Sequence, residues 1–318
     1  MRFGILGTGS VVPKHIAAAR LAGLEVVAVA SRELERARAF GMPRAYGAYA
    51  ELLDDPDVDA VINALHNGLH CEWSCRALAA GKHVLCEKPL GCNPAEVEQM
   101  TSASRKAGKL LMEGFMYRFH PQMSGVLDRV RDIGRIVHIN SYRMAYGRDR
   151  GNPRYRADAG GGALLDIGCY CVNFSRAIAG EPTQCEARAH FENGVDLTLT
   201  GMMAFPGNVT AQFCCSMEAE PNFGAEIIGT AGKIIIPHPW MPPSWPTEFS
   251  VVRDLRTEVV CVQAAEVPQH VLVGFAQQLT HFAECVEAGR KPLISAADSA
   301  GNARTIEMLL NSARLQAG

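Results

Sequence analysis

The chain has 318 residues, of which 48% are hydrophobic and 20% charged, and its formal net charge is -2. The length indicates two domains and the composition indicates a folded globular protein, while the small net charge argues against binding to nucleic acid or to an anionic membrane. Because no apolar run approaches the roughly 18 residues of a membrane-spanning helix, and the N-terminus lacks the pattern of a signal peptide, we expect a cytoplasmic protein.

Apolar strands and helical stretches alternate through the first part of the chain. The strands are expected over five ranges, namely 3–6, 25–30, 60–65, 83–86 and 109–112. This alternation predicts βαβ units and a parallel sheet. We therefore expect residues 1–121 to form an α/β Rossmann domain that binds a dinucleotide.

A glycine loop follows the first strand and opens the first helix. Backbone N–H groups at such a position bind the pyrophosphate of a dinucleotide. Gly7 permits the tight turn and Gly9 lets the backbone approach the phosphates, whereas Val12 replaces the third glycine of the G-x-G-x-x-G pattern. The alternative is an ordinary strand-to-helix turn. The loop predicts a cofactor site that contains Gly7, Thr8, Gly9, Ser10, Val11 and Val12.

The second strand ends in Ser31 and Arg32, at the position where NAD-dependent enzymes usually carry a carboxylate for the ribose hydroxyls. A hydroxyl and a guanidinium suit the 2′-phosphate of NADP, because arginine donates charge-assisted bonds to phosphate oxygens. The sequence therefore favours NADP(H) over NAD(H). In the alternative, Arg32 is solvated and Glu33 supplies the carboxylate.

The strand over residues 83–86 runs into Glu87, Lys88 and Pro89. In a parallel sheet, ligands bind beyond the carboxyl ends of the strands, and Pro89 holds Lys88 in an extended conformation. A lysine at this place can donate to a substrate hydroxyl and stabilise the alkoxide as hydride leaves. We therefore predict that Lys88 lies at a hydride-transfer site; a surface turn is the alternative.

The pattern changes after about residue 121. Longer strands are expected over 136–144, 184–191, 196–205, 209–217, 225–228 and 233–236, followed by mostly helical residues 271–315. Alternation of apolar and polar residues along these strands predicts antiparallel pairing with one more polar face. We expect residues 122–318 to form an α+β domain with a mostly antiparallel open sheet, which binds substrate. A second copy of the chain is expected to cover the open sheet, in a homodimer or homotetramer.

Cysteine and tryptophan positions carry two further expectations. The 11 cysteines show no C-x-x-C spacing, so we expect reduced thiols and no metal site. Trp240 and Trp245 lie in a proline-rich loop and are candidates for a lid or for a dimer contact.

Three motifs together resemble the glucose–fructose oxidoreductase/inositol dehydrogenase/rhizopine catabolism (Gfo/Idh/MocA) family: Gly7-x-Gly9, Glu87-Lys88-Pro89, and the run GGGALLDIGCY that begins at Gly160. The resemblance covers nearly the whole chain and implies that Lys88 is catalytic. It also implies a cofactor-side Asn-x-x-His formed by Asn67 and His70, with His66 where the family often has proline. The cofactor residues expected beyond the glycine loop are Ser31, Arg32, Leu65, His66, Asn67, His70, Glu87, Lys88 and Arg118.

The second catalytic position of the family is often histidine, but here it is Tyr170, with Asn173 three residues on. This variant, together with the segment MEGFMYRFHP over residues 112–121, resembles the subgroup of glucose–fructose oxidoreductase, NADP-dependent xylose dehydrogenases and trans-dihydrodiol dehydrogenases. The resemblance implies substrates such as xylose-type aldoses and cyclic diols.

Asp166 and Tyr170 are four residues apart, so they share one face of a helix. A free tyrosine has a pKa near 10, which a neighbouring ammonium such as Lys88 would lower. Tyr170 could then take the proton of a substrate hydroxyl, and Asp166 could hold Lys88 in place. The alternatives are a core tyrosine bonded to backbone and an aspartate that caps the helix.

The remaining polar candidates lie before and within the glycine-rich run. The family loop often reads Asn-x-Arg-x-Asp, and Asn152 and Arg154 match it, whereas Arg156 stands in place of the aspartate. Arg156 favours an anionic or polyhydroxy substrate if it faces the pocket, and a surface arginine is the alternative. The expected substrate-binding residues are Lys88, His120, Asn152, Arg154, Asp166, Tyr170 and Asn173.

The leading hypothesis is an NAD(P)-dependent oxidoreductase that acts on a secondary alcohol or hemiacetal of a small polyhydroxy substrate. One alternative is a redox-neutral enzyme whose bound cofactor is reduced and reoxidised within one cycle. Another is a non-catalytic nicotinamide-binding regulator, against which the presence of Lys88, Asp166 and Tyr170 argues.

Overall fold

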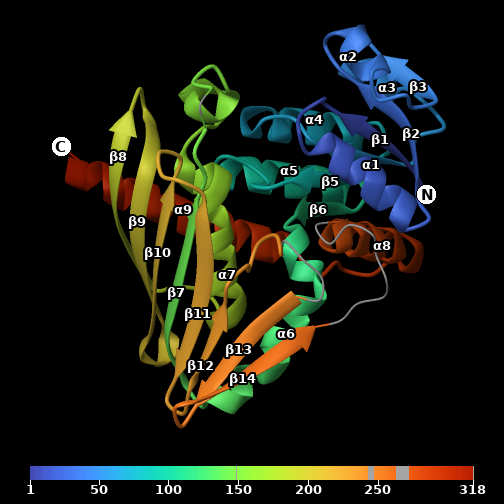
Figure 1. Cartoon of the computed structure of the whole chain (residues 1–318). Helices are drawn as coiled ribbons and strands as arrows, with labels where there is room; N and C mark the ends of the chain where they lie inside the picture. Colours follow the sequence, from blue (N-terminus) through green and yellow to red (C-terminus); the bar gives the residue numbers. More distant parts are fainter. Residues whose placement is uncertain (148, 243–246, 263–271, 318) are drawn as a thin grey trace. The chain divides into compact units, whose positions relative to one another are not determined.

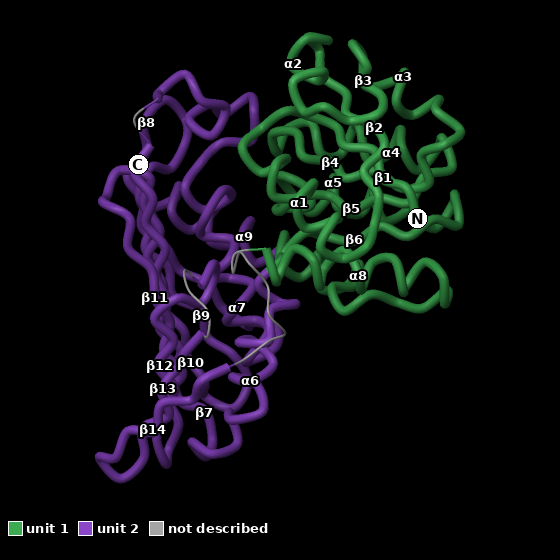
Figure 2. The backbone as a smooth tube through the Cα atoms, turned by 45° about the vertical axis from the view of Figure 1, so that its right-hand side comes forward, with its two compact units in different colours: residues 1–116, 272–303 green, residues 117–271, 304–318 purple. Residues whose placement is uncertain are grey.

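The computed structural model describes residues 1–147, 149–242, 247–262 and 272–317 (Figure 1). The chain divides into two compact units, which Figure 2 draws in different colours. The first contains residues 1–116 and 272–303, and the second contains residues 117–271 and 304–318. Among the described helices, none is both long and apolar enough to cross a bilayer.

A parallel six-stranded sheet forms the centre of the first unit, in the order β3-β2-β1-β4-β5-β6, and every neighbouring pair runs parallel. The order reverses between β1 and β4, and this crevice is where Rossmann sheets bind their ligands. The strands β1, β2, β4 and β5 match the expected positions, whereas β3 is a three-residue strand that the sequence did not reveal. The strand bounds are β1 Arg2–Leu6, β2 Glu25–Ala30, β3 Arg44–Tyr46, β4 Ala60–Asn63, β5 His83–Glu87 and β6 Leu111–Gly114.

Helices connect these strands, and fully buried valine, leucine and alanine side chains form the core. The α-helices of this part are α1 Val12–Leu21, α2 Leu34–Arg38, α3 Tyr49–Leu53, α4 His70–Ala79 and α5 Pro94–Ala107. Asn93 begins α5 by accepting the N–H of Glu96 at 3.0 Å, and Gly108 ends it in the left-handed conformation. Two 3₁₀ turns, η1 Asn67–Leu69 and η2 Met116–Phe119, follow strands β4 and β6.

The helix α8 (Leu272–Ala288) returns to the first unit, although the sequence analysis assigned all residues after 121 to the second domain. Its apolar face explains the difference. Phe282 lies with its ring centroid 6.0 Å from that of Phe3 in β1, and Phe275 packs edge-on against His15 of α1 at 5.1 Å. The sequence predicted a helix here but not the elements against which it packs.

The second unit is built on an eight-stranded sheet in the order β14-β13-β12-β11-β7-β10-β9-β8. Only the central pair β7 and β10 runs parallel among its described strands, so the expected mostly antiparallel sheet is confirmed. The edge strand β14 and its neighbour β13 were not predicted; β14 is largely exposed and its charged residues hide the strand pattern. The strand bounds are β7 Ile136–Met144, β8 Gln184–Glu192, β9 Val195–Phe205, β10 Val209–Ser216, β11 Asn222–Gly229, β12 Lys233–Ile236, β13 Thr247–Arg253 and β14 Arg256–Val262.

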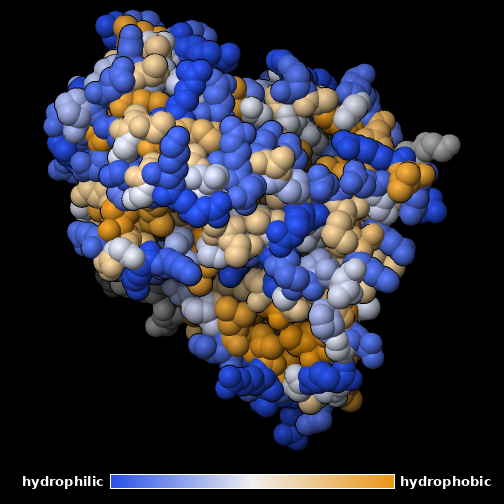
Figure 3. All heavy atoms as spheres, turned by 180° about the vertical axis from the view of Figure 1, so that it is seen from behind, coloured by the Kyte–Doolittle hydropathy of each residue, from blue (hydrophilic) through white to orange (hydrophobic). Residues whose placement is uncertain are grey.

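One face of this sheet packs against helices and the other is open. A methyl group on Gly168 would lie 2.6 Å from the Sγ of Cys215, and one on Gly201 would lie 3.0 Å from Leu309, so Cys215 and Gly201 belong to the covered face. The covering helices include α7 Cys169–Ala179 and the later part of α9 Ala296–Ala317, while α6 Pro121–Arg129 contacts β13 and β14. The unit exposes Leu127, Val137, Met202, Leu255 and Val259, and Figure 3 shows hydrophobic side chains gathered toward the bottom of the face seen from behind.

Candidate functional site

The predicted cofactor residues of the first unit lie at the carboxyl ends of neighbouring strands. The glycine loop follows β1, Ser31 and Arg32 follow β2, Leu65 and His66 follow β4, and Lys88 follows β5. Because these strands are adjacent and parallel, their carboxyl ends meet at one edge of the sheet. The sequence motifs therefore meet on a single edge.

Gly7 and Gly9 give the loop after β1 its form. Gly7 has a φ of +104°, and a Cβ at this position would lie 2.9 Å from the carbonyl oxygen of Ala64, so a side chain is excluded. At Gly9 the nearest atom to such a Cβ would be 3.9 Å away, which leaves its backbone open. The loop then enters α1, where Val12 is fully buried and occupies the place of a third glycine. This open backbone before a helix N-terminus fits a pyrophosphate.

The tip of β2 carries Ser31 and Arg32. Ser31 is buried, and its Oγ accepts the N–H of Glu33 at 3.3 Å. Glu33 is exposed and lies 3.6 Å from the guanidinium of Arg36. Arg32 is exposed and forms no ion pair with any residue that the structure describes. At the tip of β2, Glu33 therefore has an ionic partner, whereas Arg32 has none among the described residues.

The segment after β4 is fixed by His70. This histidine is fully buried, and its two ring nitrogens lie 2.9 Å from the carbonyl oxygen of Leu65 and 2.8 Å from that of Pro89. Burial lowers the pKa of His70, and the bonds to the two carbonyls oppose this effect. His70 thus ties the backbone that precedes His66 and Asn67 to the backbone that follows Lys88.

Glu87 and Lys88 stand at the end of β5. The Oε1 of Glu87 lies 2.7 Å from the Nε2 of His15 in α1. Burial opposes ionisation of Glu87, but the bond to His15 and the charges of His15 and Lys88 outweigh it, so the pKa of Glu87 is lowered. The residue before the predicted catalytic lysine is thereby an anion bonded to helix α1, which follows the glycine loop.

The second predicted catalytic group lies in the second unit, at the start of α7. Asp166 belongs to a π-helical turn, η6 Leu164–Gly168, and Tyr170 to the α-helix that follows. The Oδ2 of Asp166 lies 3.3 Å from the Nε of Arg154, so two residues that the sequence proposed separately form an ion pair. Asp166 therefore has an arginine beside it from within its own unit.

Asp196 of β9 accepts a hydrogen bond from the backbone of this π-helical turn. It is 3% exposed, and its Oδ2 accepts the N–H of Leu164 at 2.7 Å. Burial raises the pKa of Asp196 to about 6, while the bond from Leu164 acts in the opposite direction. A Cβ on Gly162 would lie 2.2 Å from the Oδ1 of Asp196, so only glycine fits there. The conformation of the glycine-rich run therefore depends on Asp196, which belongs to none of the sequence motifs.

Tyr170 lies in a cluster of aromatic rings. Its ring centroid lies 5.9 Å from those of Tyr117 and Trp240, and the guanidinium carbon of Arg143 lies 3.9 Å from the centre of its ring. Trp240 is only 2% exposed and also packs edge-on against Phe174 at 5.6 Å. The indole of Trp240 is therefore buried in this cluster and is not exposed for a dimer contact, while a lid formed by its loop stays a prediction. Trp245 lies outside the described residues.

Asn173 is fully buried, and its Oδ1 accepts hydrogen bonds from the hydroxyl of Tyr117 at 2.7 Å and from Arg118 at 3.3 Å. Its Nδ2 has no hydrogen-bond partner among the residues that the structure describes. Arg118, which the sequence analysis assigned to the cofactor, belongs to the second unit and lies beside this predicted substrate residue. A buried amide donor with no internal partner suits a ligand oxygen.

Three other predicted polar residues have local structural roles. His120 is buried, and its Nδ1 accepts the N–H of Gln122 at 3.0 Å to cap α6. The Oδ1 of Asn152 accepts the N–H of Arg154 at 3.2 Å and begins the 3₁₀ turn η4 Pro153–Tyr155. Arg156 is exposed and pairs with Asp158 two residues on. The surface alternative for Arg156 agrees with this arrangement.

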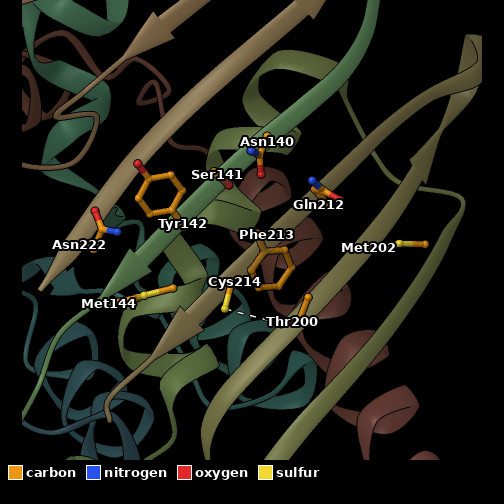
Figure 4. A pocket seen from close by; sticks show the side chains of 10 residues that line it. All are labelled: Asn140, Ser141, Tyr142, Met144, Thr200, Met202, Gln212, Phe213, Cys214 and Asn222. Atoms are coloured by element: carbon orange, nitrogen blue, oxygen red, sulfur yellow. Dashed lines mark hydrogen bonds between the residues drawn. The ribbon is translucent and has the colours of Figure 1, made fainter. Parts of the chain in front are cut away.

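A hollow of about 430 Å³ opens on the uncovered face of the large sheet (Figure 4). Figure 4 shows that its side chains come from β7, β9, β10 and β11, and the Oγ1 of Thr200 lies 3.6 Å from the Sγ of Cys214. The hollow contains none of the predicted catalytic or substrate-binding residues. The volume of this hollow is therefore not a sufficient reason to assign it as the active site. It is lined by Asn140, Ser141, Tyr142, Met144, Thr200, Met202, Gln212, Phe213, Cys214 and Asn222.

Three residues that contact the predicted site were not found from the sequence: His15, Arg143 and Asp196. None belongs to a motif, and each reaches its partner from a distant part of the chain. A buried position for His15 or Asp196 could be read from the apolar residues around it, but the partner could not.

Comparisons with known proteins agree with this geometry. Residues 1–115 match a family model described as an oxidoreductase family with an NAD-binding Rossmann fold, and residues 129–235 match the GFO/IDH/MocA C-terminal domain. A D-xylose 1-dehydrogenase (NADP(+)) of Haloferax volcanii is 32% identical, over 98% of this chain and 97% of its own. Human trans-1,2-dihydrobenzene-1,2-diol dehydrogenase is 34% identical, over 94% of this chain and 92% of its own.

A solved structure is similar to the whole chain as well. KijD10, a 3-ketoreductase from Actinomadura kijaniata in complex with NADP and TDP-benzene, superposes with a TM-score of 0.89. Its sequence is 31% identical, and the match covers 98% of this chain and 97% of that chain.

Proposed function

The chain belongs to the Gfo/Idh/MocA family of NAD(P)-dependent oxidoreductases, and from this premise we propose that it transfers hydride between NADP(H) and a secondary alcohol or hemiacetal of a small polyhydroxy compound. The observation that carries the proposal is the placement of Lys88. This lysine follows β5 at the edge where the glycine loop follows β1, with Glu87 anchored to the helix that the loop begins.

The residues present fit a nicotinamide dinucleotide. The open backbone at Gly9 and the N-terminus of α1 would hold its pyrophosphate, and the residues after β4 would lie along it. Such a cofactor supplies a hydride acceptor or donor when it is bound. The exposed Arg32 supports NADP(H) over NAD(H), because Glu33 already has Arg36 as its ionic partner. NADP is also the cofactor named for the xylose dehydrogenase and for the KijD10 complex, which supports the same preference.

The chain's own residues divide the acid–base work. Lys88 donates a hydrogen bond to the substrate oxygen that changes its charge, and so stabilises an alkoxide. Tyr170 accepts the proton of the substrate hydroxyl during oxidation and returns it during reduction. Asp166, paired with Arg154, and Asn173, whose buried Nδ2 has no partner among the described residues, orient the hydroxyl groups of the substrate.

A sugar-like or cyclic diol substrate is supported by the names of the relatives, which act on D-xylose and on a dihydrobenzene diol. Aldoses, inositols, cyclic diols and anhydrosugars form the panel to test. The reduction of NADP+ is followed at 340 nm with the wild-type protein and with Lys88→Ala in parallel. We expect turnover of at least one member of the panel, and loss of roughly 100-fold or more of it in Lys88→Ala.

Binding of NADPH is measured on both proteins as the control, because Lys88→Ala should retain it. If the wild-type protein binds NADPH but converts no member of the panel, the dehydrogenase proposal fails. Conversion of substrate without a net change in NADPH would instead identify a redox-neutral enzyme.

A second copy of the chain is the proposed partner for the open face of the eight-stranded sheet. Residues on this face include Met202, which is 55% exposed, and the hollow of Figure 4 lies on it. Light scattering should give the mass of a dimer or tetramer, and Met202→Glu should shift the protein toward the monomer. A monomer at micromolar concentration would contradict this part of the proposal.

A further inference from the structure

Arg143 stands on the covered face of the large sheet, beneath the helix that carries Tyr170. It alternates with Tyr142 and Met144, which line the hollow on the opposite face. In the ladder its neighbours are Cys215 of β10, which is fully buried, and Phe223 of β11. The pleat of β7 therefore directs this guanidinium toward the helices rather than toward solvent.

The guanidinium is stacked on a tyrosine and is not neutralised. Its central carbon lies 3.9 Å from the centre of the Tyr170 ring, and its Nη1 is buried without a hydrogen-bond partner in the described part of the chain. Among the residues that the structure describes, no carboxylate forms an ion pair with Arg143. A half-buried positive charge without a counter-ion is unfavourable, so a group that becomes negative nearby would compensate it.

Two other stacked arginines of the described chain have a carboxylate beside the guanidinium. Arg76 lies 4.6 Å from the ring centre of Trp73 and pairs with Glu72 at 2.8 Å. Arg150 lies 4.9 Å from the ring centre of Tyr155, with Glu192 3.8 Å away. Stacking on a ring therefore recurs in the described chain, and, unlike Arg76 and Arg150, the arginine on Tyr170 has no carboxylate partner among the described residues.

The titratable and charged groups near Arg143 and Tyr170 include two thiols, a second arginine and a carboxylate. Burial raises the pKa of the Cys171 thiol to about 12 and that of Cys215 well above its ordinary value, so both thiols are neutral. Tyr117 contributes a phenol that donates to Asn173, to which Arg118 also donates from 3.3 Å. Asp166, on the turn before α7, has Arg154 beside it.

We propose that Arg143 is a positioning residue that stabilises the phenolate of Tyr170, and so adapts this tyrosine to accept a substrate proton near neutral pH. A guanidinium stays charged over the whole working range of the protein. An opposite charge within about 4–6 Å lowers the pKa of an acid by roughly one to three units. The guanidinium carbon lies 3.9 Å from the centre of the ring whose hydroxyl would ionise. The inference rests on the proposed function of Tyr170 as a base.

The first test measures the tyrosine itself and needs no substrate. Tyrosine labelled with carbon-13 at the ring carbon that bears the hydroxyl is followed by NMR from pH 6 to 11, and the Tyr170 signal is assigned by its loss in Tyr170→Phe. In Arg143→Met, Tyr170 should titrate about one to three pH units higher than in the wild-type protein. Arg143→Lys, which keeps the charge, should recover at least half of that shift, and Arg76→Met should titrate as the wild type does.

The second test uses the substrate found by the panel. The acidic limb of the pH profile of kcat/KM for oxidation, on which the activity rises as the base loses its proton, should move to higher pH by the same amount in Arg143→Met, with about a tenfold loss or more at pH 7 and recovery at alkaline pH. NADPH affinity should be unchanged. Should Arg143→Met not fold, Arg143→Gln is neutral and polar and takes its place in both tests.

The outcomes separate the two proposals. If Tyr170 titrates at the same pH in the wild-type and neutral variants, the inference is overturned whatever the activity. If the titration moves but no substrate is converted, the relationship between Arg143 and Tyr170 stands and the proposed function fails. A loss of activity that is the same at every pH would assign Arg143 a structural role and also overturn the inference.

Discussion

The Nε2 of His15 lies 2.7 Å from the Oε1 of Glu87, and this contact joins the helix that begins at the glycine loop to the strand that ends at Lys88. His15 is fully buried, and the Glu87 side chain is 12% exposed. The pair therefore connects the predicted phosphate-binding and catalytic segments within one unit.

Replacing His15 by Ala should destabilise the protein by about 1–3 kcal/mol, because a buried carboxylate loses its donor. The pKa of Glu87 is lowered in the folded state, so the contribution of the pair is present at neutral pH and is lost as the pH falls below the ordinary value of 4.5. Urea denaturation at pH 7 and pH 4 measures both effects. His138→Ala, which removes an exposed histidine from Thr210, is the control and should change the free energy of unfolding by less than about 1 kcal/mol.

Replacing Tyr170 by Phe should lower kcat by at least about tenfold while the thermal midpoint changes little, since only the hydroxyl is removed. Steady-state kinetics on the substrate from the panel measure the loss. Tyr49→Phe removes a hydroxyl from a buried tyrosine of the first unit and should leave kcat unchanged. Equal activity of Tyr170→Phe and wild type would exclude Tyr170 as the base.

Asp196 should make the stability of the protein depend on pH between about 4 and 6. Its pKa is raised from the ordinary 3.8 to about 6, so the folded state binds the proton more tightly than the unfolded state. Its favourable contribution is complete below pH 3.8 and is lost as the pH rises through 6. Asp196→Asn, which keeps an acceptor for the N–H of Leu164, should therefore be more stable than wild type above pH 7, by on the order of 3 kcal/mol.

The same comparison at pH 4 should show little difference between Asp196→Asn and wild type. Asp196→Ala loses the acceptor, and it should be less stable than Asp196→Asn at every pH by about 1–2 kcal/mol. If the free energies of unfolding of Asp196→Asn and wild type differ by the same amount at pH 4 and at pH 7, the pKa of Asp196 is not raised in the folded state.

Gly162→Ala should destabilise the protein by about 2–4 kcal/mol. The residue has a φ of +124°, and the new methyl would lie 2.2 Å from the Oδ1 of Asp196. Gly180→Ala is the matched control, since Gly180 also has a positive φ, +85°, but has nothing within 4 Å of the added carbon. It should cost only about 1 kcal/mol. Denaturation curves that gave equal losses would refute a role for contact with Asp196.

Arg32→Ala should weaken NADPH binding by roughly 10- to 100-fold and change NADH binding by less than about twofold, because only the 2′-phosphate requires the guanidinium. Fluorescence titration of both cofactors measures the two dissociation constants. Arg38→Ala removes an exposed arginine of the same helix region, paired with Glu35, and should change neither. Tighter binding of NADH than of NADPH by the wild-type protein would overturn the NADP assignment.

The sequence by itself determined the two kinds of sheet and the family. Strands separated by helices indicate parallel pairing, strands with a period of two indicate antiparallel pairing, and the structure confirms both. The glycine loop and the Glu87-Lys88-Pro89 segment were also recognisable, because each consists of consecutive residues that take their place from the end of one strand. Family membership, inferred from these motifs, is confirmed by the matches over residues 1–115 and 129–235.

Only the tertiary structure decided which residues support those motifs. His15 and Glu87 are separated by 72 positions, Leu164 and Asp196 by 32, and α8 returns to the first unit from the far end of the chain. Periodicity shows that a side chain faces inward, but its partner depends on which elements pack together and in what register. The stack of Arg143 on Tyr170 has the same cause, since it requires the order of β7 in the sheet and the position of α7 above it.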